Sequence, residues 1–258
     1  MGFLKKFTKQ EISWMMYDWA NSAHSVIVVT ILPIFFDTVA GYTADSVSSM
    51  STWGYATSIA MLIVALAAPF LGVFGDIRGM RKKLFSFFML LGVAACAGMA
   101  FTPGMDFTSG PVAAGKVASL ILVLYIVSVI GFDASAIYYD AFLTDVTTEE
   151  RMDKVSTMGY GLGYIGGSTI PLVLSLLLIQ LGDAIGIGTM LATRISFLLT
   201  AGWWLVFTLP MLRHVHQKHG IDPERNIVLH TLRNVKDTCC MILKNKSVVF
   251  FILSLIHI

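Results

Sequence analysis

The apolar residues of this chain are gathered into long, nearly uninterrupted blocks, and these blocks decide what the chain can fold into. Six of them have about the length at which a helix crosses the ~30 Å hydrocarbon layer of a membrane. They lie at about residues 14–37, 53–75, 84–101, 117–142, 158–181 and 195–212. We therefore predict an all-α membrane protein, in which these blocks are the transmembrane helices of one bundle.

A further apolar block begins near Ser247 and runs to Ile258. As a helix it would reach only about 18 Å, which is too short to span. We interpret 247–258 as the start of a seventh, truncated span, and the chain as the N-terminal half of a longer protein. The missing C-terminal half is then an expected partner.

The composition agrees with a membrane protein and narrows the possible partners. The chain is 56% hydrophobic and only 13% charged, whereas soluble domains carry about 25% charged residues. The net charge of +2 needs no nucleic acid to explain it. The three cysteines form neither a CxxC pair nor a metal-ligand spacing. We expect the lipid bilayer as the surroundings, and neither a cofactor nor a metal.

The basic residues indicate how the chain is threaded. Lysine and arginine concentrate in the N-terminal tail and in the second, fourth and sixth connections, and only Lys116 and Arg194 fall on the other side. Because cytoplasmic loops carry the Lys/Arg excess, we expect a multi-pass protein with its N-terminus in the cytoplasm.

Residues 213–246 form the one long connection, which we predict to be a cytoplasmic linker containing an amphipathic helix. Asp222-Pro223 is typical of a helix start. This helix lies either on the inner membrane surface or against the bundle. His214, His216 and His219 could hold a metal, but a basic juxtamembrane segment is the interpretation we prefer. Apolar residues recur at helical spacing at Val228, Leu232, Val235, Cys239 and Ile242.

Polar residues interrupt the first apolar block on a single face. Asp18, Asn21 and Ser25 are spaced i, i+3, i+7, so one side of a helix carries all three. An Asp at a helix centre costs roughly 2.5 to 3.5 kcal/mol on insertion scales. We therefore expect this face to point inward, toward protein or a water-filled cavity.

The fourth block carries two further carboxylates. Asp133 and Asp140 differ by only ~20° around a helix and ~10 Å along it. No Lys or Arg occurs at mid-membrane depth to neutralise them, which suits proton coupling or the binding of another cation. The alternative is that they fix helix packing through hydrogen bonds, or that Asp140 lies at the interface. We interpret His24 as a packing residue rather than a proton shuttle.

The fifth block opens with glycines at every fourth position, Gly159, Gly163 and Gly167. Such a ridge lets another helix approach closely. The run also contains a GxGxxG pattern, but no strand precedes it, so we do not expect a nucleotide site.

The short second connection resembles the loop signature of the major facilitator superfamily, GxxxD-(R/K)-xGx-(R/K)-(R/K). The matching residues are Gly72, Asp76, Gly79, Arg81 and Lys82, and Ile77 departs from the pattern. Gly79 permits a tight turn, and Asp76 can accept charged hydrogen bonds. Such a cluster can hold one side of a transporter shut, so we interpret it as a gating loop.

Four further runs resemble the autophagy-related vacuolar effluxer family and its bacterial relatives. His24 stands where an aromatic residue is expected and Asp140 where an asparagine is expected. The runs are Ser13-Trp14-x-x-Tyr17-Asp18-Trp19-Ala20-Asn21-Ser22-Ala23, Gly131-Phe132-x-x-Ser135 with Tyr138-Tyr139-x-Ala141-Phe142-Leu143, Gly159-Tyr160-x-x-Gly163-Tyr164-x-Gly166-Gly167, and Trp203-Trp204-x-x-Phe207-x-x-Pro210.

The resemblance implies a twelve-helix transporter of two six-helix halves that works by alternating access, with helices 1 and 4 lining a central cavity. It suggests a secondary active or facilitative carrier of a small polar solute such as amino acids or peptides, in a bacterial inner membrane or, for a fungal protein, a vacuolar membrane. The alternatives are a non-transporting sensor or scaffold derived from a transporter and, less favoured, an intramembrane acid/base enzyme using Asp133 and Asp140. No nucleophile accompanies these carboxylates, so we do not expect an enzyme.

Overall fold

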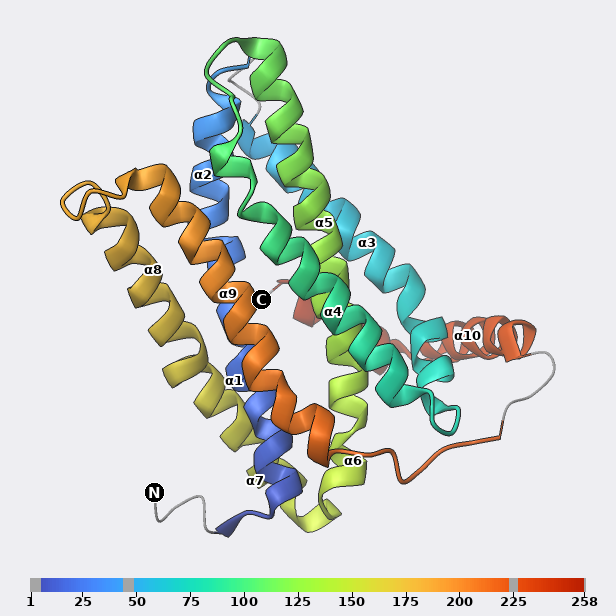
Figure 1. Cartoon of the computed structure of the whole chain (residues 1–258). Coiled ribbons are helices and arrows are strands. Elements are labelled where there is room, and N and C mark those ends of the chain that lie inside the picture. The colour runs from blue at the N-terminus through green and yellow to red at the C-terminus, as the bar shows by residue number, and fades with distance from the viewer. Residues whose placement is uncertain (1–5, 44–48, 223–226, 258) are drawn as a thin grey trace.

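The computed structural model describes residues 6–43, 49–222 and 227–257, and these residues are almost entirely helical (Figure 1). They contain no β-strand, and their isolated β-bridge joins Ile77 to Ile221. The prediction of an all-α membrane bundle is confirmed. Six segments are long and apolar enough to cross a membrane: Lys9–Ala40, Ser49–Asp76, Arg81–Gly104, Pro111–Val146, Glu149–Leu181 and Gly188–His214.

Each of the six predicted blocks lies inside one of these segments, and a shorter helix covers most of 247–258. Several segments consist of more than one helix. The elements are α1 (Lys9–Val29), α2 (Ile31–Ala40), α3 (Ser49–Asp76), α4 (Arg81–Met99), η3 (Thr102–Gly104), α5 (Pro111–Ala141), α6 (Leu143–Val146), α7 (Glu149–Leu162), η4 (Gly163–Ser168), α8 (Thr169–Leu181), α9 (Gly188–His214), α10 (Ile227–Lys244) and α11 (Lys246–His257).

The first span starts with a capping box and breaks after almost six turns. The Thr8 hydroxyl accepts from the backbone N–H of Glu11, and the Glu11 carboxylate accepts from the backbone N–H of Thr8. The break lies at Thr30, where φ is −116° and ψ is −71°. Pro33, in the first turn of α2, cannot donate a backbone hydrogen bond to the carbonyl four residues earlier, so the helix divides here.

The fifth span contains a π-helical turn, η4, between α7 and α8. Pro171 follows it, and the missing N–H of this proline leaves the carbonyl of Gly167 without its usual helical donor. Single π-turns of this kind often mark functional sites in helices. Here the turn lies beside α1, where the glycine ridge makes its closest approach.

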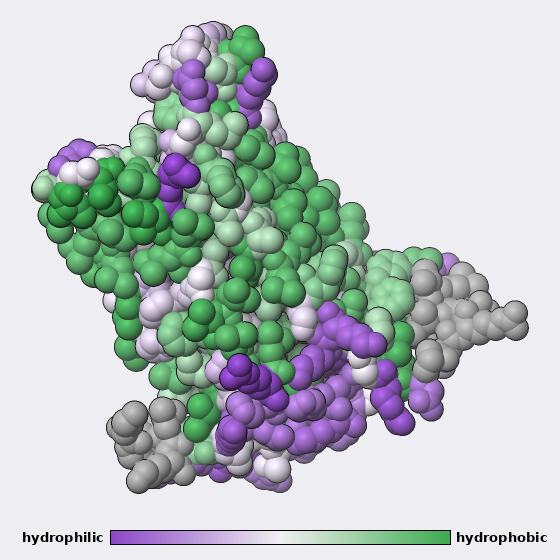
Figure 2. All heavy atoms as spheres, viewed as in Figure 1, coloured by the Kyte–Doolittle hydropathy of each residue, from purple (hydrophilic) through white to green (hydrophobic). Residues whose placement is uncertain are grey.

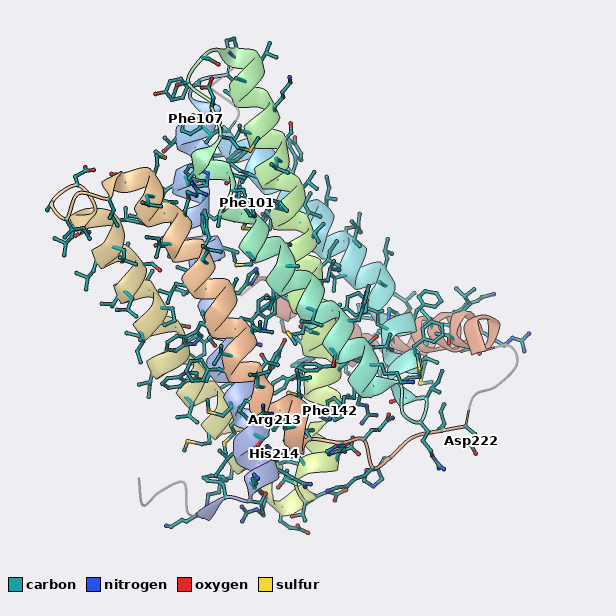
Figure 3. All side chains as sticks on the ribbon, in the orientation of Figure 1. Phe101, Phe107, Phe142, Arg213, His214 and Asp222 are labelled. Atoms are coloured by element: carbon teal, nitrogen blue, oxygen red, sulfur yellow. The ribbon has the colours of Figure 1, made fainter. Side chains whose placement is uncertain are left out.

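The interior holds two apolar clusters, one toward each end of the bundle. Figure 3 shows Phe107 and Phe101 toward one end, and Phe142, Arg213 and His214 toward the other. Phe107 belongs to the cluster that contains Phe35 and Phe197, while Phe142 belongs to the cluster that contains Trp14, Tyr17 and Trp204.

The face that Figure 2 shows is apolar over most of the bundle, and most of its hydrophilic residues gather at one end. On α3, Tyr55, Leu62 and Leu66 are each more than half exposed. A lipid-facing or partner-facing surface accounts for such exposure. We call the hydrophilic end the basic end; its basic residues include Arg78, Arg81, Lys82, Arg151 and Lys218.

The linker after α9 first follows the basic end and then leaves it. Figure 1 shows α10 running across the direction of the spans. Leu232 and Met241 on α10 are exposed, so the bundle leaves these two apolar side chains uncovered. The predicted helix start at Asp222-Pro223 falls on Pro223, which lies outside the described residues, as do the side chains of Val228 and Cys239.

Candidate functional site

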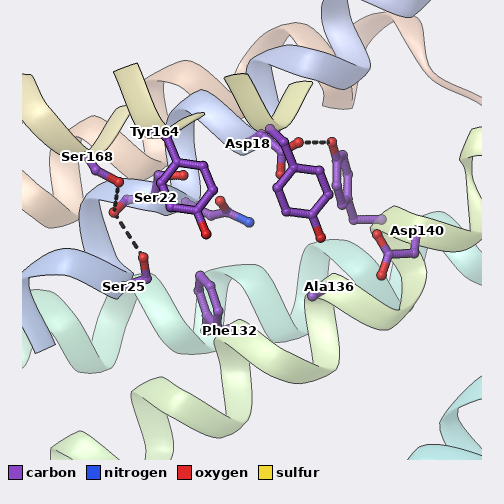
Figure 4. Close-up of a pocket in the computed structure, with 11 residues that line it drawn as sticks. Asp18, Ser22, Ser25, Phe132, Ala136, Asp140, Tyr164 and Ser168 are labelled. Atoms are coloured by element: carbon purple, nitrogen blue, oxygen red, sulfur yellow. Dashed lines mark hydrogen bonds between the residues drawn. The ribbon is translucent and has the colours of Figure 1, made fainter. Parts of the chain in front are cut away.

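A polar cavity opens between α1, α5 and the α7–η4–α8 segment, with a volume of about 230 Å³. Figure 4 shows how the side chains of these three spans converge on it. Its lining residues are Asp18, Asn21, Ser22, Ser25, Phe132, Ala136, Tyr139, Asp140, Tyr160, Tyr164 and Ser168.

Asp18 is held in place by a stack of aromatic side chains that joins α1 to α5. The Tyr139 hydroxyl donates to Asp18 Oδ2 at 2.8 Å. Trp14 stacks on the Tyr139 ring with 4.2 Å between centroids, and its indole N–H donates to the Tyr139 carbonyl at 2.9 Å. In the same layer, the Tyr17 hydroxyl is hydrogen-bonded to Ser135 Oγ at 2.7 Å. The orientation of the Asp18 carboxylate is therefore set by packed rings rather than by a basic partner.

The glycine ridge brings the fifth span onto this carboxylate. A Cβ added at Gly159 would lie 2.6 Å from Asp18 Oδ2, and one at Gly163 would lie 2.8 Å from Ser22 Oγ. A Cβ at Gly167 would lie 2.5 Å from the Trp19 carbonyl oxygen. Any side chain at these positions would push the fifth span away from α1, so glycine is required for the close approach.

The same ridge positions two aromatic rings at the cavity. Tyr160 and Tyr164 are one helical turn apart, with their ring centroids 6.5 Å from each other and their planes inclined by 20°. They are 60% and 71% exposed. Together with Phe132 and Tyr139 they line the cavity with aromatic surface.

The other end of the cavity is polar and uncharged. Ser25 and Ser168 both donate to the carbonyl oxygen of Ser22, at 3.2 Å and 3.4 Å (Figure 4). Asn21 is only 7% exposed and lines the cavity beside them. This end offers hydroxyl and amide groups, while the Asp18–Asp140 end offers carboxylates.

Neither cavity carboxylate has a basic partner among the described residues. The salt bridges of these residues involve Arg81, Arg151 and His219, and none includes Asp18 or Asp140. No hydrogen bond to the Asp140 carboxylate occurs within the described ranges, and this residue is exposed. The cavity is therefore acidic and its charge is uncompensated.

The structure brings together four of the five predicted cavity residues, Asp18, Asn21, Ser25 and Asp140. The fifth, Asp133, does not line this cavity. Asp133 differs from Asp140 by only ~20° around α5 but by ~10 Å along it, and at the depth of Asp133 the cavity is lined by the preceding residue, Phe132. Within the described residues the buried Oδ2 atom of Asp133 has no hydrogen-bond partner.

Sequence reasoning missed several lining residues. Tyr160 and Tyr164 each follow a glycine of the ridge, and the ridge pattern predicts close helix packing but does not indicate that these two rings line a cavity. Tyr139 was quoted only as part of a resemblance. His24, by contrast, packs as expected: it is 1% exposed, lies 3.1 Å from Ser128 Oγ and stacks on Phe132. The missed lining residues are Ser22, Phe132, Ala136, Tyr139, Tyr160, Tyr164 and Ser168.

A second group of charges lies at the basic end, in the predicted gating loop. We call Arg81, Asp76 and Asp145 the Arg81 cluster. Arg81 contacts Asp145 at 2.6 Å and Asp76 at 3.0 Å. It also donates to the carbonyls of Gly75 and Ala141. The second, third and fourth spans are thus joined by one buried guanidinium.

The linker completes the Arg81 cluster. The backbone N–H groups of Lys218 and His219 each donate to Asp145 Oδ1 at 2.9 Å. Gln217 accepts from the Gly79 N–H and donates to the Gly75 carbonyl. Asp145 was not singled out in the sequence, because its partners come from distant segments.

The structure gives a reason for Gly79 and Lys82 of the predicted gating loop, but none for Gly72. Gly79 has φ of +78°, a conformation that favours glycine. Lys82 donates to the Val215 carbonyl at 3.0 Å and so also holds the linker. A Cβ at Gly72 would meet nothing within 4 Å, so no contact in the described residues requires glycine there.

The HxHxxH histidines do not converge. His214 lies near Ser13 Oγ and the Pro210 carbonyl, whereas His219 contacts Asp145. Among the described residues, no group of three His, Cys, Asp or Glu side chains is arranged to hold a metal.

Six apolar spans, with a polar cavity between the first, fourth and fifth of them, define a multi-pass integral membrane protein in the part of the chain that the structure describes. Residues 41–152 and 144–256 match the family model described as "Vacuole effluxer Atg22 like". The chain belongs to this Atg22-like family, and the predicted resemblance is confirmed.

The chain is also similar to a protein of Bacillus subtilis (strain 168), named as the uncharacterized MFS-type transporter YxiO. The two are 41% identical over 255 residues, which cover 97% of this chain and 57% of that relative. The chain therefore spans little more than half the length of the curated relative it matches. No solved structure matches it significantly.

Proposed function

We propose that this chain forms one half of a secondary active or facilitative transporter that moves a small polar solute across the membrane. The observation that carries the proposal is the cavity, where Asp18 and Asp140 are presented between spans without a basic partner. Ionisable residues inside a membrane bundle commonly mark substrate or ion pathways. Membership of the Atg22-like effluxer family supports the same conclusion.

The orientation of the protein follows from the basic end. Lysine and arginine gather there, so this end and the N-terminus face the cytoplasm. The membrane is the inner membrane of a bacterium, or the vacuolar membrane if the protein is fungal. The exposed apolar side chains of α3 fit lipid or a second six-helix bundle.

The Arg81 cluster and the glycine ridge are suited to transport by alternating access. The Arg81 cluster would hold the cytoplasmic side closed, and the glycine ridge would let the fifth span move along α1. The solute is amino acids or short peptides, and protons or another cation would couple to the cavity carboxylates. Substrates of this kind carry polar groups that the cavity can contact.

Solute flux in vesicles tests the proposal. The full-length protein is reconstituted, and uptake of an amino-acid mixture is compared for the wild-type protein, Asp140→Asn and Asp183→Asn. Asp183 lies in the exposed loop between α8 and α9, far from the cavity in the chain's fold, and supplies a matched loss of charge. We expect at least a tenfold loss of flux in Asp140→Asn alone. Equal flux in all three proteins would contradict the role of Asp140 in transport, and no flux in the wild type with amino acids or peptides would contradict the transport proposal itself.

A further inference from the structure

The lining of the cavity combines negative charge with aromatic surface, and this combination restricts the solute. Two carboxylates, Asp18 and Asp140, face the same space as four aromatic rings, and no lysine, arginine or histidine of the described residues lines it. Tyr160 lies within electrostatic range of both carboxylates. An anionic group placed here would meet repulsion without a compensating cation.

We propose that the cavity binds the ammonium group of a protonated organic amine, between Asp18 and Asp140 and against the rings of Tyr160 and Tyr164. This inference rests on the proposed transport function and specifies which chemical group of the solute this half of the protein recognises.

The hydrogen-bonding capacity of the carboxylates fits an ammonium donor. Tyr139 uses one oxygen of Asp18, Oδ2, at 2.8 Å. The second oxygen of Asp18 and both oxygens of Asp140 accept no hydrogen bond from the described residues. An ammonium group has three N–H donors and no acceptor, so it matches this set of acceptors. Its charge would also offset the repulsion between the two carboxylates.

The rings favour an organic cation over a bare metal ion. A cation within about 6 Å of an aromatic face is attracted by the ring quadrupole. A hard metal cation such as magnesium would instead be surrounded by oxygen ligands from carboxylates and water, and it would gain nothing specific from the rings that occupy much of this wall. The neutral end of the cavity, with Asn21, Ser22 and Ser25, is free to contact another polar group of the same molecule.

The part of the cavity that this chain forms is small. Its volume of about 230 Å³ is below the roughly 300 to 1,000 Å³ of pockets that hold drug-sized ligands. A compact amine is therefore a better fit than a folded or polymeric cation.

Competition binding with two probes that share a phenyl ring tests the assignment. Phenethylamine carries only an ammonium group, and 3-phenylpropionate carries only a carboxylate. Binding of each to the purified full-length protein is measured by calorimetry in lipid nanodiscs, with sodium and potassium chloride as separate competitors. We expect phenethylamine to bind at least tenfold more tightly than 3-phenylpropionate, and neither salt to displace it at matched ionic strength.

Variants separate the carboxylates from the rings. Asp140→Asn and Asp18→Asn should each weaken phenethylamine binding at least tenfold, and the amide oxygen in Asp18→Asn can still accept from Tyr139. Tyr160→Phe should retain binding, whereas Tyr160→Leu should lose it severalfold because the ring is gone. Asp183→Asn is the charge-matched control, and thermal melting of each variant shows that it is folded.

Three results would overturn the inference: equal binding of the two probes, displacement of phenethylamine by sodium or potassium, or unchanged amine binding in folded Asp140→Asn. Absence of phenethylamine binding up to about 10 mM, beyond the usual range of substrate constants, would also overturn it. Failure of transport is a separate outcome. Selective amine binding without flux would contradict the transport proposal alone, and flux without amine selectivity would contradict this inference alone.

Discussion

The cavity and the Arg81 cluster each contain two carboxylates, but the hydrogen-bond partners of these carboxylates differ between the two regions. At the Arg81 cluster, Asp145 is completely buried and receives a guanidinium, two backbone N–H groups and the ring nitrogen of His219. In the cavity, Asp140 has no hydrogen-bond partner among the described residues, and Asp18 has only a tyrosine hydroxyl.

This difference separates a structural role from a binding role. A buried carboxylate whose acceptors are all used stabilises the arrangement of the segments that supply its partners. A carboxylate with open acceptors in a cavity contributes little to the fold and remains available to a ligand. If the roles differ in this way, loss of a saturated carboxylate should destabilise the fold far more than loss of an open one.

Removal of Asp145 should have the largest effect. Asp145→Ala leaves the buried Arg81 guanidinium without its shorter ion pair, and breaking a buried pair costs about 3 to 5 kcal/mol. We expect that loss in the free energy of unfolding, measured by denaturant titration in detergent. Asp76→Ala removes the other partner of Arg81. The Asp76 side chain is 58% exposed, so this change should lower the free energy of unfolding by no more than about 1 kcal/mol. Equal effects of the two changes would contradict a structural role specific to Asp145.

The glycine ridge gives the next largest effect. Gly167→Ala places a Cβ against the Trp19 carbonyl, and such overpacking should cost about 1 to 3 kcal/mol. Gly161→Ala is the matched control, because a Cβ there meets nothing within 4 Å and alanine favours the helix. The melting temperature should therefore fall in Gly167→Ala and not in Gly161→Ala. Equal melting temperatures would show that α1 and the fifth span are not packed tightly at Gly167.

Loss of a linker contact should lower the free energy of unfolding by a smaller amount. Gln217→Ala removes the bonds to Gly79 and Gly75, and a net loss of about 1 to 2 kcal/mol is expected for hydrogen bonds of this kind. Hydrogen exchange at the Gly79 amide should quicken at the same time. Gln180→Ala, at an exposed position on α8, should change neither quantity. Unchanged exchange at Gly79 in Gln217→Ala would mean that the linker does not hold the gating loop.

The cavity carboxylate should matter least for stability. Asp140→Asn removes a charge that no described residue pairs, so the free energy of unfolding should stay within about 0.5 kcal/mol of the wild type. The measurement is the same denaturant titration as for Asp145→Ala. A loss comparable with that of Asp145→Ala would remove the distinction between the two regions.

The helical period allowed part of the site to be predicted. Asp18, Asn21 and Ser25 share a face because their spacing follows the turn of a helix, and the structure indeed places all three at the cavity. The same reasoning grouped Asp133 with Asp140, yet only Asp140 lines the cavity. Periodicity gives the angle between two side chains on one helix, and Asp133 and Asp140 share that angle within ~20°. They lie ~10 Å apart along α5, and the position of the neighbouring helices decides at which depth that face meets a cavity.

Asp145 marks the limit of local reasoning. Its partners are Arg81 from the loop after the second span and Lys218 and His219 from the linker. No local spacing connects these segments, since they meet only when the helices are assembled. The two tyrosines of the fifth span were missed for the same reason.

The sequence by itself determined the class of fold, because blocks of apolar residues long enough to cross a bilayer leave the backbone no alternative to helices. It also determined where the close helix contact could occur, since only glycines permit it. The tertiary structure decided which carboxylates have all their oxygen atoms hydrogen-bonded to other residues and which have oxygen atoms left without a donor. That property depends on donors from other segments, and their distances are set by how the whole bundle packs.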